Sequence, residues 1–313
     1  MRGVGIALLL CSATAAADSN DIDLAKLGTK VTDASGNVTY VGSPGEFRSL
    51  ASQLGTVLAP DLLTPADTIG WDGFQLAVDY ANTTIDQSAA YWRVLEGPVP
   101  SAMNTVGFFA RKGLWLPLPS FEVGAGAVHL VDSHLWTAQL YAKFALVEGY
   151  HDLPLPSLAV RGGVSRLMNQ RDLDLTIASL DVSISKHVGI GGTWRLDPYA
   201  GYDLLMIIPH SEVIDPVPNV DPLQPGNQGA QGQNFVFADQ DTIFRNKIFL
   251  GAKLEYYIFT IALEGAITLA GTSTDERQNA PAACVPMSTT SFCNAQDAAK
   301  LQRTLALTVG LDL

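Results

Sequence analysis

The chain has few basic residues and few charges of either sign. Its 313 residues contain 19 Lys and Arg against 31 Asp and Glu, a net charge of −12, and only 16% are charged. No stripe of Lys or Arg is available to release counterions from a phosphate backbone, which excludes nucleic acid as a partner. The apolar fraction of 47% excludes disorder and requires a large buried core or a surface that faces lipid.

Cysteine is also scarce: the three are Cys11, Cys284 and Cys293. Cys11 lies in a stretch typical of an export signal, with a basic start, a short apolar run and small residues up to position 17. We expect residues 1–17 to be removed before Asp18. An exported protein folds in an oxidising compartment, which favours a disulfide between Cys284 and Cys293. A metal site is less favoured because no His lies near them.

Long apolar runs are absent from the rest of the chain. No stretch approaches the roughly 18 consecutive apolar residues that a membrane-spanning helix requires. Backbone polar groups must be satisfied internally within lipid, so insertion of such a chain requires a closed β-barrel.

Residues 18–69 differ from the rest and are predicted to be a periplasmic appendage or a plug inside a barrel. Ser43, Pro44 and Glu46 have the spacing of a capping box with proline at the first helical position. They predict a helix over 44–58, preceded by a small hairpin over 30–42. The apolar face of this helix consists of Phe47, Leu50, Leu54 and Leu58.

From residue 70 to residue 313, apolar residues alternate with small or polar ones. The final segment, 304–313, keeps this alternation to the end and resembles the strand that outer-membrane barrels present to their insertion machinery. We predict an all-β fold, an antiparallel transmembrane barrel of about ten to twelve strands with a short N-terminal helical segment. Within 173–185, Leu173, Leu175 and Ile177 are out of step with the residues that follow, which predicts a β-bulge.

Charged residues on the inward rows are the candidate functional residues. They mix both signs, and they either line a polar path or fill a closed lumen as ion pairs, because ten strands barely exceed the size that side chains can fill. The predicted lumen-lining residues are Asp79, Lys143, Arg161, Asp181, Asp203, Arg245, Lys247, Lys253, Glu255 and Glu264.

The connections alternate in length, which predicts an orientation. With a periplasmic C-terminus, the mostly short turns fall on the periplasmic side and the long loops, near 82–104, 209–241 and 270–300, fall outside. An interfacial aromatic belt is expected at the periplasmic end. Its members are Trp115, Tyr150, Trp194, Tyr199, Tyr256 and Tyr257.

No catalytic, metal or cofactor site is predicted, and we expect no enzyme. His210 and Ser211 lie where a strand meets an outer loop, but adjacent strand residues point to opposite faces, which separates a nucleophile from its base. The remaining histidines show no metal-ligand spacing.

The helix over 47–58, the link 62–66 and a first strand beginning at 70–74 together resemble the long-chain fatty-acid outer-membrane transporter family. The resemblance implies that the N-terminal segment plugs the barrel, although this chain is short for that family's barrel. It transfers no ligand residue.

Two functions are compatible with these features. One is a porin-like or hydrophobic-solute transport channel of the bacterial outer membrane, and the other is a structural or surface-interaction barrel with a filled lumen. Expected partners are outer-membrane lipid, lipopolysaccharide and the insertion machinery at the C-terminal strand. The oligomeric state stays open.

Overall fold

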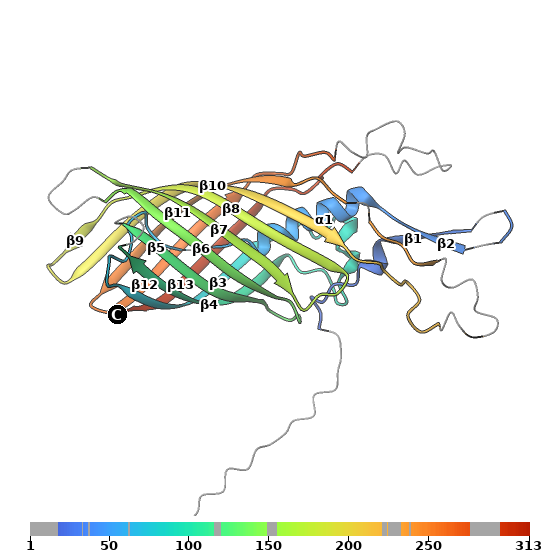
Figure 1. Ribbon diagram of the computed structural model, residues 1–313, viewed down its shortest axis with the longest axis horizontal. Helices are drawn as coiled ribbons and strands as arrows, with labels where there is room; N and C mark the ends of the chain where they lie inside the picture. The colour runs from blue at the N-terminus through green and yellow to red at the C-terminus, as the bar shows by residue number, and fades with distance from the viewer. Residues whose placement is uncertain are drawn as a thin grey trace, which may run out of the picture.

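The fold is a β-barrel of tilted strands, with the helix α1 (Pro44–Val57) of the N-terminal segment inside it (Figure 1). The structure, a computed structural model, describes residues 18–313 apart from 33, 37, 62, 116–119, 149–154, 221–223, 225–232, 238 and 276–294. Its helices are η1 (Leu24–Leu27), α1 (Pro44–Val57) and η2 (Ala90–Val94). Its strands are β1 (Gly28–Thr32), β2 (Val38–Gly42), β3 (Phe74–Thr84), β4 (Ala102–Leu114), β5 (Phe121–Leu130), β6 (Trp136–Val147), β7 (Ser157–Met168), β8 (Leu173–Ser185), β9 (Val188–Ile190), β10 (Trp194–Ser211), β11 (Ile243–Tyr256), β12 (Phe259–Thr268) and β13 (Gln302–Asp312).

Within the described residues, ten antiparallel strands close into a ring. They follow the order β11-β12-β13-β3-β4-β5-β6-β7-β8-β10, and β10 pairs with β11 to complete it. The short strand β9 adds to β10, and β1 and β2 form a separate hairpin. This confirms the all-β barrel and the short N-terminal helical segment. In the part of the chain that is described, no helix is both long and apolar enough to cross a membrane.

Side chains alternate between the two faces of the barrel strands. Along β13, for example, Leu305, Leu307 and Val309 are 57%, 40% and 50% exposed, whereas their neighbours are buried in the lumen. Similar exposed apolar side chains continue around the ring on β3, β8, β11 and β12. A closed ring with an apolar exterior and a polar interior is the arrangement of a transmembrane β-barrel.

The two ends of the barrel differ as predicted. The C-terminus lies with the turn at residues 257–258. The strand ends that the two long connections join, Ser211 with Ile243 and Thr268 with Gln302, lie at the other end. Short turns mark the periplasmic end and long loops the outer end. Among the predicted belt residues, Trp115, Trp194, Tyr256 and Tyr257 are exposed. Tyr150 lies outside the described residues.

Tyr199 corrects the predicted belt, because only 2% of it is exposed and it lies inside the lumen. The reason is the early start of β10 at Trp194. Residues five positions apart on a strand point to opposite faces, so an outward Trp194 places Tyr199 inward.

The predicted bulge in β8 is wrong. The register of β8 is continuous against both β7 and β10, and its burial alternates without a break. Leu173, Leu175 and Ile177 are inward-facing and fully buried, because they belong to an apolar core that also contains Leu50 and Leu54 of α1. The register irregularity lies instead in β6, between Ala145 and Val147.

The N-terminal segment runs from the outer end of the barrel to the periplasmic end. Asn20 is bound at the outer end, where its backbone nitrogen donates to the oxygen of Asp132 at 2.8 Å. The helix α1 follows at the outer end, and the chain reaches the periplasmic end at Gly73, which is bonded to Gly113. We call residues 44–69 the plug.

The predicted capping box does not form at the start of α1. Ser43 is the N-cap residue but makes no side-chain capping bond. Glu46 instead accepts two hydrogen bonds from Arg93, at 2.7 and 2.6 Å. A bidentate pair with arginine is stronger than a single neutral capping bond, and this one ties α1 to η2.

The predicted signal peptide over 1–17 and the predicted disulfide between Cys284 and Cys293 both lie outside the described residues.

Candidate functional site

A row of charged side chains crosses six neighbouring strands on the lumen wall. We call it the charge ladder: it consists of the directly opposed residues Glu122 on β5, Lys143 on β6, Arg161 on β7, Asp181 on β8, Asp203 on β10 and Lys247 on β11. All six are buried. Opposed residues share one face of a sheet, so the strand register alone brings these side chains together.

Each cation of the ladder has an acidic neighbour on the adjoining strand. Lys143 Nζ lies 3.2 Å from Glu122 Oε2, and Arg161 Nε lies 2.5 Å from Asp181 Oδ2. Lys247 Nζ lies 3.5 Å from Asp203 Oδ2. Opposed like charges are destabilising, and the ladder contains two such steps, so these three pairs keep the row stable.

The same three cations also bind the plug. Lys247 Nζ donates to Asp61 Oδ1 at 2.6 Å, and Arg161 donates to Thr64 Oγ1 at 3.1 Å. Lys143 Nζ donates to the backbone oxygen of Asp67 at 2.7 Å. Residues 61, 64 and 67 of the plug thus contact the three ladder cations, and the backbone oxygen of Pro65 also accepts from Lys143 Nζ, at 3.2 Å.

The periplasmic end of the plug is fastened by His187, which lies between β8 and β9. His187 Nε2 lies 2.9 Å from Asp67 Oδ2, and Nδ1 is hydrogen-bonded to Asp197 on β10. Burial lowers the pKa of His187, but the hydrogen bonds with Asp197 and Asp67 outweigh it and raise the pKa to about 9. His187 is thus a cation at neutral pH that joins a plug carboxylate to a wall carboxylate.

The outer half of the plug is packed into the apolar core. The predicted helix face, Phe47, Leu50, Leu54 and Leu58, is fully buried there. The Phe47 ring stacks on Phe237 with centroids 4.4 Å apart. The opposite side of α1 is also buried: Arg48 donates to Ser273 Oγ and Arg245 to Ser52 Oγ, at 2.9 and 2.6 Å. Every residue of α1 from Phe47 to Val57 is therefore buried against the wall and the loops.

The remaining predicted lumen residues form local pairs outside the ladder. Arg111 Nη2 lies 3.6 Å from Asp79, and Tyr199 Oη donates to Glu264 at 3.1 Å. At the periplasmic rim Lys253 Nζ lies 3.0 Å from Asp312 and 3.3 Å from Glu255. Glu255 is partly exposed, with 22% of its side chain accessible.

Sequence reasoning missed Glu122, Asp61 and Asp67. Glu122 lies on the same inward row as Gly124 and Gly126, so strand parity could have identified it. The two plug aspartates follow no periodic pattern, and only the path of the plug brings them to the ladder.

Aromatic rings fill the lumen beside the ladder, lying over inward-facing glycines. A Cβ atom at Gly124 would lie 2.1 Å from the Tyr141 ring, and one at Gly126 would lie 2.3 Å from Phe109. On the opposite wall a Cβ at Gly251 would lie 2.4 Å from Tyr199. The cavity beside Val57, Asp61 and Phe109 measures about 20 Å³, enough for one water molecule.

A larger cavity opens at the periplasmic end. It measures about 270 Å³ and is lined by residues that include Thr64, Asp67, Lys143, Arg195, Lys253 and Asp312. This vestibule reaches the plug and the first cation of the ladder.

No family model matches the chain, and no curated protein matches its sequence. Among solved structures it is similar to an outer-membrane channel from Pseudomonas putida F1, with 11% identity over 82% of this chain and 100% of that one and a TM-score of 0.35. It is also similar to Neisserial surface protein A, with 12% identity over 77% of this chain and 96% of that one and a TM-score of 0.28. A third similar structure is a Pseudomonas aeruginosa FadL homologue, with 9% identity over 82% of this chain and 96% of that one and a TM-score of 0.23.

These similarities concern the fold alone and transfer no function. The assignment to the bacterial outer membrane is carried by the barrel itself: an even-numbered antiparallel ring, an apolar exterior and long loops at one end.

Proposed function

We propose that this protein is an outer-membrane barrel whose own N-terminal segment plugs the lumen. It has no permanently open pore and acts through its outer surface. The observation that carries the proposal is the path of the plug, which occupies the lumen from the outer mouth to the periplasmic end. An open diffusion channel requires a water-filled lumen, and here the chain itself takes that space.

Two kinds of contact support a tight seal. In the outer half, α1 packs into an apolar core together with residues of β8, β10 and β11, which excludes water and ions. In the periplasmic half, the charge ladder holds the extended part of the plug. Displacing this part would leave the buried cations Lys143, Arg161 and Lys247 with fewer partners, which is costly inside a barrel.

The outer mouth supplies the surface on which such a barrel can act. The base of the β1–β2 hairpin lies close to two aromatic rings: a Cβ atom at Gly28 would lie 2.8 Å from the Phe235 ring, and one at Gly42 would lie 2.5 Å from Phe237. Phe237 in turn stacks on Phe47 of the plug. The plug thereby holds the base of the hairpin in position through Phe237, and a surface held in this way suits a structural or interaction role because little ordering is needed on binding.

The test is conductance of the purified full-length mature protein in a planar bilayer. We expect no stepwise conductance, while heat-modifiable migration on a gel reports a folded barrel. An open porin reconstituted in the same way is the positive control. Regular open steps from the folded wild-type protein would contradict the proposal.

Gated solute transport is a second candidate, and it is favoured by the polar nature of the periplasmic half of the plug. Hydrogen bonds and ion pairs to Lys247, Arg161 and Lys143 hold residues 61–67, and the vestibule already reaches them. Polar contacts of this kind can be exchanged for water or for a polar solute more readily than an apolar core can.

A double substitution separates the two candidates. Asp61→Ala with Thr64→Val removes the side-chain contacts to Lys247 and Arg161. Asp215→Ala with Thr29→Val is the matched control at exposed positions. Conductance in the plug variant alone would favour gated transport. Silence of both variants, with folded barrels, would favour the surface role.

We propose no hydrolytic activity for the outer rim. His210 is exposed and lies 2.9 Å from Asp239, whereas Ser211 is buried and accepts a hydrogen bond from the backbone of Phe237. The two side chains point to opposite faces of β10, so His210 is not placed to activate Ser211.

A further inference from the structure

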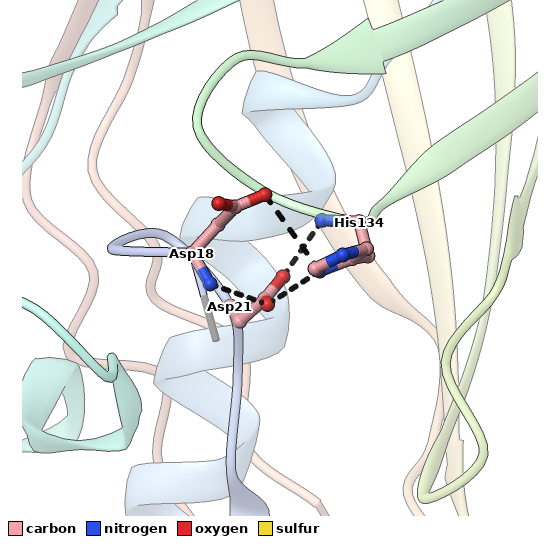
Figure 2. A group of neighbouring side chains, drawn as sticks. All are labelled: Asp18, Asp21 and His134. Atoms are coloured by element: carbon pink, nitrogen blue, oxygen red, sulfur yellow. Dashed lines mark hydrogen bonds and ion pairs between the residues drawn. The ribbon is translucent and has the colours of Figure 1, made fainter. Parts of the chain in front are cut away.

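Three potential metal ligands meet at the outer mouth, away from the charge ladder. Asp18 and Asp21 belong to the start of the described chain, and His134 belongs to the β5–β6 turn, residues 131–135 (Figure 2). Their ligand atoms all lie within 4.8 Å of one another. The imidazole nitrogen distinguishes this group from the acidic residues of the outer loops, which offer oxygen alone.

The distances are close to those of a bound transition metal. His134 Nδ1 lies 2.7 Å from Asp21 Oδ2 and 3.7 Å from Asp18 Oδ2. Zinc bonds to nitrogen and oxygen of roughly 2.0–2.2 Å place tetrahedral ligands about 3.4 Å apart. To surround one ion, His134 Nδ1 and Asp21 Oδ2 would move apart by about 0.7 Å, and His134 Nδ1 and Asp18 Oδ2 would approach by about 0.3 Å.

The backbone around the group is already held in position. Asn20 donates from its backbone and its side chain to the oxygens of Asp132 and Val131, both at 2.8 Å. The oxygen of Asp21 accepts from the backbone of Glu96 at 3.1 Å. Little rearrangement is then required on binding, and a pre-organised site binds more tightly than a mobile one.

Cleavage of the predicted export signal would supply a fourth donor. The predicted export signal ends before Asp18, and cleavage there turns the Asp18 nitrogen into a free amine. This nitrogen lies 3.0 Å from Asp21 Oδ2. One amine, one imidazole and two carboxylates make four donors, two of them negatively charged.

We propose that Asp18, Asp21 and His134 bind one divalent transition-metal ion, of the zinc class, as a clasp between the mature N-terminus and the β5–β6 turn. Mixed nitrogen and carboxylate ligands favour Zn²⁺ and its neighbours over Ca²⁺, which takes six to eight oxygen ligands. The exposed side of the group leaves room for water to add a further ligand. The bound ion would join the start of the N-terminal segment, which continues into the plug, to the β5–β6 turn at the outer end of the barrel.

The test is calorimetric titration of the purified full-length mature protein in detergent with Zn²⁺. We expect one saturable site, with affinity at least tenfold lower in His134→Ala and in Asp21→Asn. His210→Ala is the matched control, because His210 faces a single carboxylate, Asp239. This control should bind Zn²⁺ as the wild type does.

Thermal unfolding supplies a second readout that does not depend on heat of binding. Zn²⁺ should raise the melting temperature of the wild type and of His210→Ala, and leave that of His134→Ala unchanged. The proposal is overturned if the wild type shows no saturable binding, if His134→Ala binds Zn²⁺ equally well, or if Ca²⁺ binds as tightly as Zn²⁺.

Discussion

At the scale of single residues, the lumen is filled by rings that require glycine opposite them. The Tyr141 ring lies against Gly124, and its hydroxyl donates to Glu122 of the charge ladder at 2.6 Å. The ring cannot move away from a new side chain without disturbing that bond. Glycine at position 124 therefore lets the Tyr141 ring lie where its hydroxyl can bond to Glu122 of the charge ladder.

Gly124→Ala should destabilise the barrel by about 1–3 kcal/mol, the range for overpacking a buried site. The matched control is Gly265→Ala, where a Cβ would have no atom within 4 Å. Urea unfolding of both variants in lipid or detergent measures the difference. Equal free energies of unfolding for the two variants would contradict this account of the ring and the glycine.

Strand parity predicted most of the buried charges from the sequence. Lys143, Arg161, Asp181, Asp203 and Lys247 lie on inward rows, and alternation is a local property that a sequence records directly. Their partners in the plug and the proposed metal ligands were beyond the sequence. Asp18 and His134 are separated by more than a hundred positions, and no periodicity links residues across such a gap.

At the scale of elements, the plug is attached to the periplasmic end of the wall through His187. Burial lowers the pKa of His187, but the hydrogen bonds with Asp197 and Asp67 raise it by more, so that the pKa is about 9. An unfolded histidine has a pKa of about 6.5. The bridge therefore contributes its full stability below pH 6.5 and loses it as the pH rises through 9.

We expect the melting temperature of the protein to fall between pH 7 and pH 10, and to fall less in His187→Gln. Across this window, the contribution of His187 changes by at most about 1.4 kcal/mol per pH unit. Circular dichroism melting at several pH values measures it. Parallel pH profiles for wild type and variant would show that His187 does not fasten the plug.

The interpretation of β8 shows where element-level reasoning from the sequence fails. A change in the phase of apolar residues has two physical causes: an extra residue in the strand, or an inner face that turns from polar to apolar. Leu173, Leu175 and Ile177 are of the second kind, because α1 packs against them. The phase change was visible in the sequence, but choosing between its causes required the position of the helix.

At the scale of the whole molecule, the described chain begins at the outer mouth and its C-terminus lies at the periplasmic end. An epitope tag inserted between residues 17 and 18 should be labelled in intact cells. The same tag in the turn at Gly191 and Gly192 should be labelled only after the outer membrane is permeabilised. Labelling in the reverse pattern would contradict the orientation assigned from loop lengths.

The sequence predicted a barrel of about ten to twelve strands and its helix, since each rests on local alternation or spacing. It left open whether the N-terminal segment is a periplasmic appendage or a plug inside the barrel. That choice depends on contacts such as Asp61 with Lys247, which join positions far apart in the chain. Long-range contacts of this kind leave no trace in one sequence.

The route of the plug also constrains assembly. The first and last strands of the ring, β3 and β13, pair with each other, between residues as distant in sequence as Gln75 and Asp312. A closed ring of ten strands is little wider than its own side chains, so a folded hairpin and helix cannot be drawn through it afterwards. Residues 18–60 therefore either pass outward before the first and last strands join, or cross the closed ring unfolded and fold at the outer mouth afterwards. In both cases the folded hairpin and helix keep the chain threaded through the ring.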